Sequence, residues 1–151
     1  TYDRGNAATL LPYSLATRTV ILVRQFRYAA YVSGYDDLMI EAVAGMLDDK
    51  SPEVRIRFEA EEEIGYRLGD IKKVFEAFMS PGSVTEKLHF FVAEYRPDMK
   101  VATGGGIASE GEDIEVLELS IDDALAMIGD GHIADAKTIM LLYYAALNVF
   151  G

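Results

Sequence analysis

The chain has 151 residues, enough for one domain with a substantial core, and half of them are hydrophobic. Its net charge of −11 argues against nucleic acid and anionic membranes as partners, because both attract proteins that carry an excess of Lys and Arg. A small anionic substrate stays possible if bound cations reverse the local charge. The absence of cysteine excludes disulfides, thiolate nucleophiles and zinc–thiolate sites.

The N-terminal third predicts three strands. Ala7–Tyr13 and Thr19–Phe26 are apolar and β-branched segments joined by a polar turn. Leu38–Ala42 predicts a short third strand that leads into a loop at Ala44 and Gly45.

The next segment predicts a helix with clear ends. Ser51 is a good N-cap, Pro52 suits the first helical position, and Gly65 suits a left-handed C-cap. Four glutamates crowd its last turns, at positions 59, 61, 62 and 63. Each is disfavoured there by about 0.3–1 kcal/mol because the C-terminal end of a helix is negative.

Such a cluster needs a compensating cation, which two sources could provide. The first is a pair of arginines on a solvated acidic face, where Arg55 would pair with Glu59 and Arg57 with Glu61, one turn later. The other is a metal ion. Carboxylates without sulfur ligands, and with only His89 and His132 as imidazoles, favour a hard cation bound through oxygen. His89 lies in an apolar strand and is expected to be structural.

The C-terminal half alternates strands, a glycine-rich loop and helices. The expected strands are Lys73–Phe78, Leu88–Tyr95 and Ile114–Leu119, with a loop at Pro97–Gly111. The expected helices are Ile121–Ile128, capped by Ser120, and Thr138–Val149, starting near Asp135. This interleaving predicts one α/β domain over residues 1–151, an α/β/α sandwich with a mixed sheet.

The run from Gly45 to Tyr66 resembles the Nudix box. In that family a glycine, five residues, Glu and seven residues precede Arg-Glu, and the pattern ends in Glu-Glu, any residue, glycine and an apolar residue. The segment Glu59–Tyr66 matches the second half position by position. The first half is one residue short, with Lys50 or Ser51 in place of the first Glu, and Phe58 stands where the family has Arg.

The resemblance extends over nearly the whole chain. Outside the box, the chain resembles the nucleoside-diphosphate-sugar branch of the family. This resemblance rests on Arg24–Arg27, Glu41–Gly45, Ser80–Glu86, Gly104–Gly106 and Asp113–Leu119. Pro81 lies fifteen residues past Tyr66, a spacing that marks the ADP-sugar group. The resemblance implies a Nudix-type α/β/α sandwich and Mg²⁺-dependent hydrolysis of the pyrophosphate bond of a nucleotide-sugar, with Mn²⁺ as a substitute ion. GDP-mannose is the expected substrate. The alternatives are ADP-ribose or another ADP-sugar, and a degenerate domain that binds a nucleotide without turnover.

The resemblance also implies roles for single residues. The metal ligands would be the Ala44 carbonyl, Glu59, Glu63 and Glu112, with Glu62 beside them as a ligand or orienting group. The general base would be Glu110 or Glu86. The substrate would contact Arg27, Gly45, Met46, Glu86 and Lys137.

The residues alone leave plainer roles open at several of these positions. Arg27 fits a surface arginine, Lys137 a solvated lysine, and Glu110 and Glu112 an acidic loop. The tyrosines at 28, 31, 143 and 144 are expected to pack rather than to stack on a base.

Three further expectations concern the whole protein. The resemblance implies a homodimer. With no apolar run of membrane-spanning length and no signal-peptide pattern, a cytoplasmic location is expected. Because the first residue is not Met, we expect a preceding native segment, which in the resembled enzymes is a β region that helps to build the dimer and reach the base.

Overall fold

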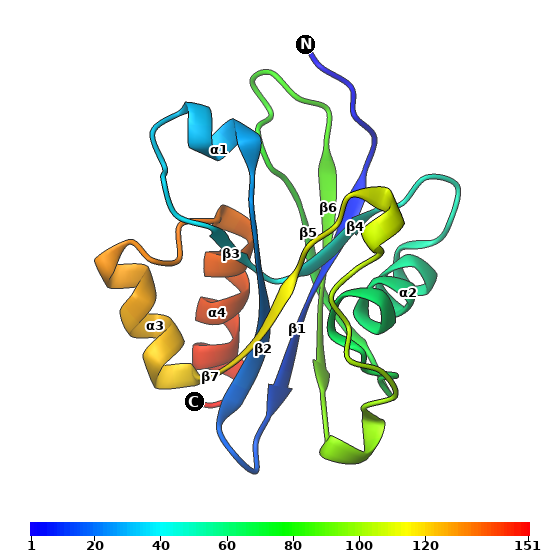
Figure 1. Ribbon diagram of the computed structural model, residues 1–151, viewed down its shortest axis with the longest axis vertical. Coiled ribbons are helices and arrows are strands. Elements are labelled where there is room, and N and C mark those ends of the chain that lie inside the picture. Colours follow the sequence, from blue (N-terminus) through cyan, green and yellow to red (C-terminus); the bar gives the residue numbers. More distant parts are fainter.

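The computed structural model describes all 151 residues except the side chain of Glu110. The sheet contains seven strands (Figure 1): β1 (Ala7–Ser14), β2 (Thr19–Gln25), β3 (Met39–Glu41), β4 (Val43–Met46), β5 (Lys72–Phe78), β6 (Lys87–Glu94) and β7 (Glu115–Ser120). The helices are α1 (Tyr28–Val32), α2 (Pro52–Ile64), α3 (Ile121–Asp130) and α4 (Ala136–Asn148), with two short 3₁₀ turns, η1 (Pro97–Met99) and η2 (Ala108–Glu110). Among the described residues, no helix is both long and apolar enough to cross a bilayer.

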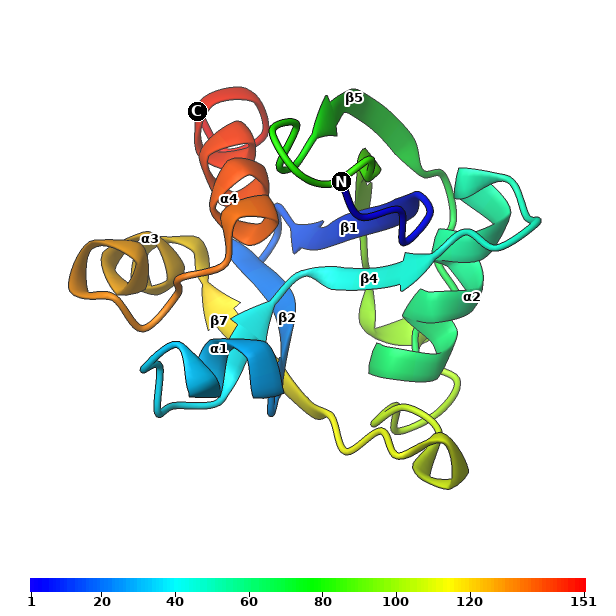
Figure 2. The ribbon, with the colours of Figure 1, turned by 90° about the horizontal axis from the view of Figure 1, so that it is seen from above.

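The sheet is built around β1. This strand runs parallel to β6, from Ala7 opposite Leu88 to Tyr13 opposite Glu94, whereas the other pairings are antiparallel. The sheet is therefore mixed, as predicted. At one end β1 pairs with β2, and at the other end it pairs with β4. β4 runs from beside β2 toward α2 (Figure 2), so the two neighbours of β1 diverge.

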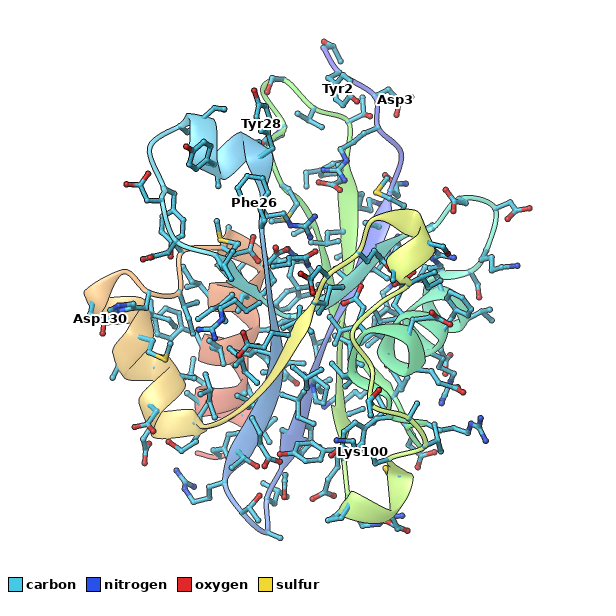
Figure 3. The ribbon with its side chains drawn as sticks, viewed as in Figure 1. Tyr2, Asp3, Phe26, Tyr28, Lys100 and Asp130 are labelled. Atoms are coloured by element: carbon cyan, nitrogen blue, oxygen red, sulfur yellow. The ribbon has the colours of Figure 1, made fainter. Side chains whose placement is uncertain are left out.

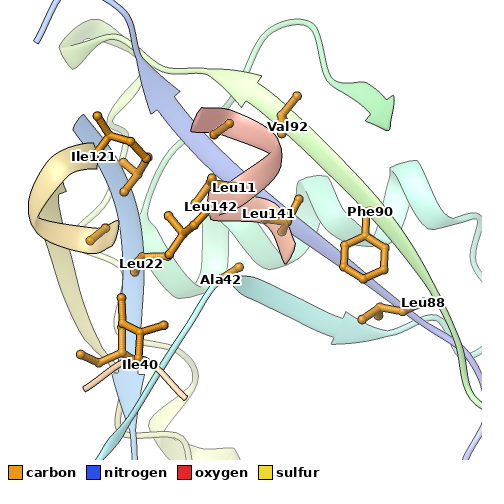
Figure 4. Packing of buried hydrophobic residues seen from close by; sticks show 14 of the residues in the cluster. Leu11, Leu22, Ile40, Ala42, Leu88, Phe90, Val92, Ile121, Leu141 and Leu142 are labelled. Atoms are coloured by element: carbon orange, nitrogen blue, oxygen red, sulfur yellow. The ribbon is translucent and has the colours of Figure 1, made fainter. Parts of the chain in front are cut away.

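Successive residues of the central strands face opposite layers. In β2, Val20 and Leu22 belong to the core under α3 and α4, while Ile21 and Val23 belong to the core under α2. Figure 4 shows the first of these cores, and Figure 1 shows the helices on opposite sides of the sheet. The period-two burial confirms the predicted α/β/α sandwich.

The helix of the acidic cluster has the predicted ends. The Ser51 hydroxyl accepts a hydrogen bond from the Val54 N–H at 3.4 Å, and Pro52 opens the helix. Gly65 closes it in the left-handed region, with φ of 76°. The glutamates therefore lie in the last turns of α2, one face of which packs on the sheet through Ile56, Ala60 and Ile64.

The short strand expected over Leu38–Ala42 is confirmed as β3, but the loop expected at Ala44 and Gly45 is wrong. After pairing with β2 the chain breaks at Ala42 and continues as β4 on β1. The break has a partner outside the sheet, because the Ala42 N–H donates to the Thr138 hydroxyl of α4 at 2.8 Å. α1 was not expected either. It is five residues long and buries none of them, so it leaves no amphipathic pattern in the sequence.

Candidate active site

A cleft of about 860 Å³ opens where β2 and β4 diverge. Its wall contains nine of the predicted site residues: Arg27, Ala44, Gly45, Met46, Glu59, Glu63, Glu86, Glu112 and Lys137. Of the described candidates, only Glu62 lies outside that wall, half-buried on α2 beside the others. The side chain of Glu110, the other candidate base, lies outside the described part of the chain.

One wall of the cleft is acidic. Glu59 and Glu63 stand one turn apart on α2 and are only 6% and 4% exposed. The Ala44 N–H donates to Oε1 of Glu63 at 3.4 Å. Glu59 lies against Gly45, where a Cβ atom would come within 2.4 Å of its Cγ. Glycine at position 45 thus lets β4 pass close to the carboxylate.

Burial raises the pKa of both glutamates, and it raises that of Glu63 to about 9, with the charge of Glu59 adding to the effect. The charge of Glu112 also raises the pKa of each, whereas Arg55 lowers that of Glu59. The proximity of the two acids thus favours the neutral form of Glu63. Among the described residues Arg55 is the one cation paired with these carboxylates, so the acidic wall has too little positive charge to balance them.

The acidic wall fits a hard divalent cation. Its donors are carboxylate oxygens, and a cation between them would offset their mutual repulsion. The described side chains do not yet surround one point as three ready-made His, Asp or Glu ligands. An ion at this wall also requires the carboxylates to be deprotonated.

The glycine-rich loop fixes Glu112 relative to α2. The Gly105 and Gly106 N–H groups donate to the carbonyls of Glu63 and Glu62, at 2.9 and 3.0 Å. A Cβ atom at Gly106, whose φ is 79°, would come within 2.8 Å of the Glu112 Cβ. The Ile107 N–H donates to Oε1 of Glu112 at 2.8 Å. The loop thus satisfies carbonyls at the end of α2 and brings Glu112 to the cleft.

The opposite wall is basic and is organised by a buried carboxylate, Glu41. Arg27 donates to both oxygens of Glu41, from Nε at 2.6 Å and from Nη2 at 3.0 Å. Lys137 Nζ donates to Oε1 of Glu41 at 2.7 Å and to Oδ2 of Asp135 at 2.9 Å. Asp135 also caps α4 by accepting from the Thr138 N–H. Two cations are therefore held at the cleft by two acids.

These groups keep their charges. Burial alone would raise the pKa of Glu41, but Arg27 and Lys137 outweigh it and hold that pKa below its ordinary value. Burial likewise works to lower the pKa of Lys137, and the charges of Glu41 and Asp135 raise it instead. Arg27 and Lys137 thus stay protonated at the cleft, each held by an ion pair.

Comparison with known proteins identifies the family. No protein-family model matches the chain. The chain is 56% identical over 148 residues to proteins named GDP-mannose pyrophosphatase from Pectobacterium atrosepticum and Salmonella arizonae, covering 97% of this chain and 76% of each relative. It is 53% identical over 150 residues to the protein of that name from Yersinia pestis, covering 99% of this chain and 75% of the relative. The chain belongs to the Nudix hydrolase family.

As a Nudix hydrolase, the protein is an enzyme that acts on a phosphoanhydride bond. Members of this family generally need a divalent metal ion. The family resemblance inferred from the box is therefore confirmed, even though this box is one residue short and lacks its arginine.

The pairing of the acidic cluster is only partly as predicted. Arg55 pairs with Glu59 at 2.7 Å, one turn apart. Arg57 does not pair with Glu61. It reaches Glu53, one turn earlier on the same face, at 3.3 Å and donates to the Leu68 carbonyl at 3.0 Å. Glu61 pairs instead with a residue beyond the helix, Arg67.

This Nudix hydrolase has cleft residues that received no role from the sequence. Glu41 lies in a segment that carries the family resemblance, but only the folded chain reveals its two cations. Arg4 lies 3.6 Å from the carboxylate of Glu86, and its Nη2 approaches the Met46 sulfur at 3.2 Å. No local pattern marks these pairs, because their partners are far away in the sequence.

The expectation that the tyrosines pack holds for Tyr144, whose ring meets Phe75 edge-on at 6.1 Å. It is wrong for Tyr28, which is 70% exposed and lines the cleft near the start of α1 (Figure 3). Tyr31 contacts Phe26 yet stays half-exposed, and Tyr143 is exposed as well. His89 lies in β6 facing Glu76, and burial lowers its pKa, consistent with a structural role.

Proposed function

We propose that this Nudix hydrolase cleaves the pyrophosphate bond of GDP-mannose. Water adds to one phosphorus, the bridging P–O bond breaks, and the products are a nucleoside monophosphate and a sugar 1-phosphate. The observation that carries the proposal is the pairing of an acidic wall with a basic wall across one cleft. The name shared by relatives at 53–56% identity supports the choice of substrate.

Mg²⁺ is the proposed ion, with Mn²⁺ as a substitute. The Ala44 carbonyl, Glu59, Glu63 and Glu112 would hold it, with Glu62 nearby. When bound, such an ion stabilises charge on phosphate oxygens and activates a water molecule. Mg²⁺ suits this site because it commonly binds through a few carboxylates together with substrate phosphates.

The basic wall binds and orients the substrate in this proposal. Arg27 and Lys137 are the cations for the phosphates or the sugar, and Glu41 fixes both in place before substrate arrives. Such preorganisation reduces the cost of ordering two long side chains on binding. Gly45 and Met46 line the cleft beside the acidic wall and would contact the diphosphate.

A general base must take the proton of the attacking water, and Glu86 and Glu110 are the candidates. Glu86 lines the cleft, with 14% of its side chain exposed, and is paired with Arg4. Comparing Glu86→Gln with Glu110→Gln identifies the base. Its loss should lower kcat by about 10²–10⁴-fold and remove the acidic limb of the pH–rate profile.

A panel of nucleotide-sugars with Mg²⁺ and identification of the products tests the proposal. We expect GMP and mannose 1-phosphate from GDP-mannose, with a kcat/KM above that for ADP-ribose, because this ratio measures discrimination. A higher kcat/KM for ADP-ribose would instead make the protein an ADP-sugar pyrophosphatase, the alternative that the spacing of Pro81 favours.

The second alternative is a nucleotide sensor without turnover, which Phe58 at the box arginine position favours. Tight binding of GDP-mannose with no product after hours, in the presence of Mg²⁺, would support the sensor. Release of product on the time scale of seconds to minutes would exclude it.

We also infer a homodimer. The apolar side chains of Phe26, Tyr31, Val32 and Leu38 are 45–59% exposed around α1. Such a group on one side of a monomer suits a protein interface. Sedimentation velocity tests this, and a purely monomeric protein at micromolar concentration would contradict it.

A further inference from the structure

Glu59 receives its one ion pair from within its own helix. Nη2 of Arg55 lies 2.7 Å from Oε1 of Glu59, and the two side chains are only 21% and 8% exposed. Among the described residues, Glu63 and Glu112 form no ion pair and accept hydrogen bonds from backbone N–H groups. Arg55 is thus the cation that contacts the acidic wall.

Phe58 stands where the Nudix box has its arginine, and it contacts Arg55 instead of Glu59. The guanidinium carbon of Arg55 lies 5.3 Å from the centroid of the Phe58 ring. The Nε atom of Arg55 is buried and has no hydrogen-bond partner, so the terminal Nη2 carries the polar contact. The ring therefore restricts the flat guanidinium while Nη2 holds the carboxylate.

Glu59 is confined from two sides. Arg55 occupies one oxygen, and the Gly45 backbone leaves no room for a Cβ atom beside the Glu59 side chain. A carboxylate fixed in this way loses less freedom when it binds an ion. A planar guanidinium suits this task better than a lysine ammonium, which offers no fixed fork and no stacking face.

We propose that Arg55 is the positioning residue for Glu59 and that, with Phe58 as its platform, it takes the place of the missing box arginine. The inference rests on the proposed role of Glu59 as a metal ligand. It moves the support of that ligand from position 58 to position 55, one turn earlier on the same helix.

The test measures metal binding without substrate. Mn²⁺ is titrated into the metal-free protein, and free Mn²⁺ is followed by electron paramagnetic resonance. Arg55→Met should weaken Mn²⁺ binding by about 10–100-fold, the effect typical of losing a group that orients a metal ligand. Arg57→Met is the matched control, because Arg57 lies on another face of α2 and pairs with Glu53. The Arg57→Met variant should bind Mn²⁺ as tightly as the unmutated protein does.

Steady-state kinetics at saturating Mg²⁺ add a second readout. Arg55→Met should lower kcat and leave KM for GDP-mannose within about twofold, since a positioning residue acts on the ligand and not on the substrate. Arg55→Lys should recover part of the Mn²⁺ affinity that Arg55→Met loses. Phe58→Ala removes the aromatic platform and keeps the charge of Arg55, and it should lower Mn²⁺ affinity several-fold. These two variants also decide the matter if Arg55→Met fails to fold.

The inference is overturned if Arg55→Met binds Mn²⁺ as tightly as Arg57→Met. A rise in KM with unchanged Mn²⁺ affinity would overturn it too, because Arg55 would then be a substrate contact. Should the unmutated protein bind Mn²⁺ without hydrolysing any nucleotide-sugar, the proposed function fails, while the Mn²⁺ titrations still decide the role of Arg55.

Discussion

The ammonium of Lys137 lies 2.7 Å from Oε1 of Glu41, although the two residues are 96 positions apart in the sequence. Arg27 forms a two-pronged ion pair with the same carboxylate. Glu41 therefore joins the start of α4 to the end of β2 and, at the same point, orders the two cations of the cleft. We therefore expect both the stability of the fold and the binding of substrate to depend on this one buried side chain.

Replacement of the Glu41 carboxylate should lower both the stability of the protein and its affinity for substrate. Glu41→Gln leaves Lys137 and Arg27 without their shared acid, and loss of one partner from a buried ion pair costs about 3–5 kcal/mol. We expect a drop in the melting temperature on the order of 10 °C and a higher KM for GDP-mannose. Glu115→Gln is the control, because its pair with Arg24 is half-exposed and such pairs contribute at most about 1 kcal/mol. Equal melting temperatures for the two variants would contradict the role of Glu41.

The same carboxylate should impose a pH dependence on stability. Its pKa in the folded chain is lower than its ordinary value of 4.5, because Arg27 and Lys137 outweigh the effect of burial. Its contribution is therefore complete above pH 4.5 and is lost as the pH falls through the folded pKa. Urea unfolding at a series of pH values should show the gap between the unmutated protein and Glu41→Gln narrowing below pH 4.5. A gap that stays constant down to pH 3 would rule this out.

Loss of Glu63 should separate activity from folding. In the metal-free chain, burial already favours the neutral form of this carboxyl, so the neutral amide of Glu63→Gln should leave the melting temperature nearly unchanged. We expect kcat to fall by roughly 10²–10³-fold and the stabilisation by Mn²⁺ to disappear. Glu61→Gln serves as the control, because Glu61 pairs with Arg67 outside the cleft. Retained activity in Glu63→Gln would remove this residue from the metal site.

The parts of the fold that could be predicted from the sequence are those with a local signal. Ser51 and Gly65 mark the ends of α2 through capping chemistry that depends on neighbouring residues only. The central strands follow from apolar, β-branched segments. α1 could not be predicted because it buries no side chain. The change of partner between β3 and β4 could not be predicted either, since it depends on a hydrogen bond from Ala42 to the distant Thr138.

The candidate site also has one part with a local sequence signal and another part that depends on tertiary structure. The carboxylates of the acidic wall can be predicted from the sequence because Glu59 and Glu63 are close together in it and match a family pattern. The helical spacing of Arg55 and Glu59 predicts an ion pair as well, but only one on a solvated surface. Burial of that pair, and of Glu41 between its two cations, is a tertiary property. No periodicity or motif in a single sequence reports it.

The glycine-rich loop provides the last prediction. Gly104 has a φ of 76°, and a Cβ atom there would lie 2.6 Å from the carbonyl oxygen of Glu63. Gly104→Ala should therefore combine backbone strain of about 1–2 kcal/mol with overpacking of about 1–3 kcal/mol. Gly131→Ala isolates the strain, because Gly131 has a φ of 88° and no atom within 4 Å of its Cβ position. In urea unfolding, Gly104→Ala should be the less stable variant. Only Gly104→Ala should also lose Mn²⁺ affinity, because the displaced loop carries Glu112 away from α2. If both variants lose equal stability and both keep Mn²⁺ affinity, close docking of the loop on α2 does not matter for the metal site.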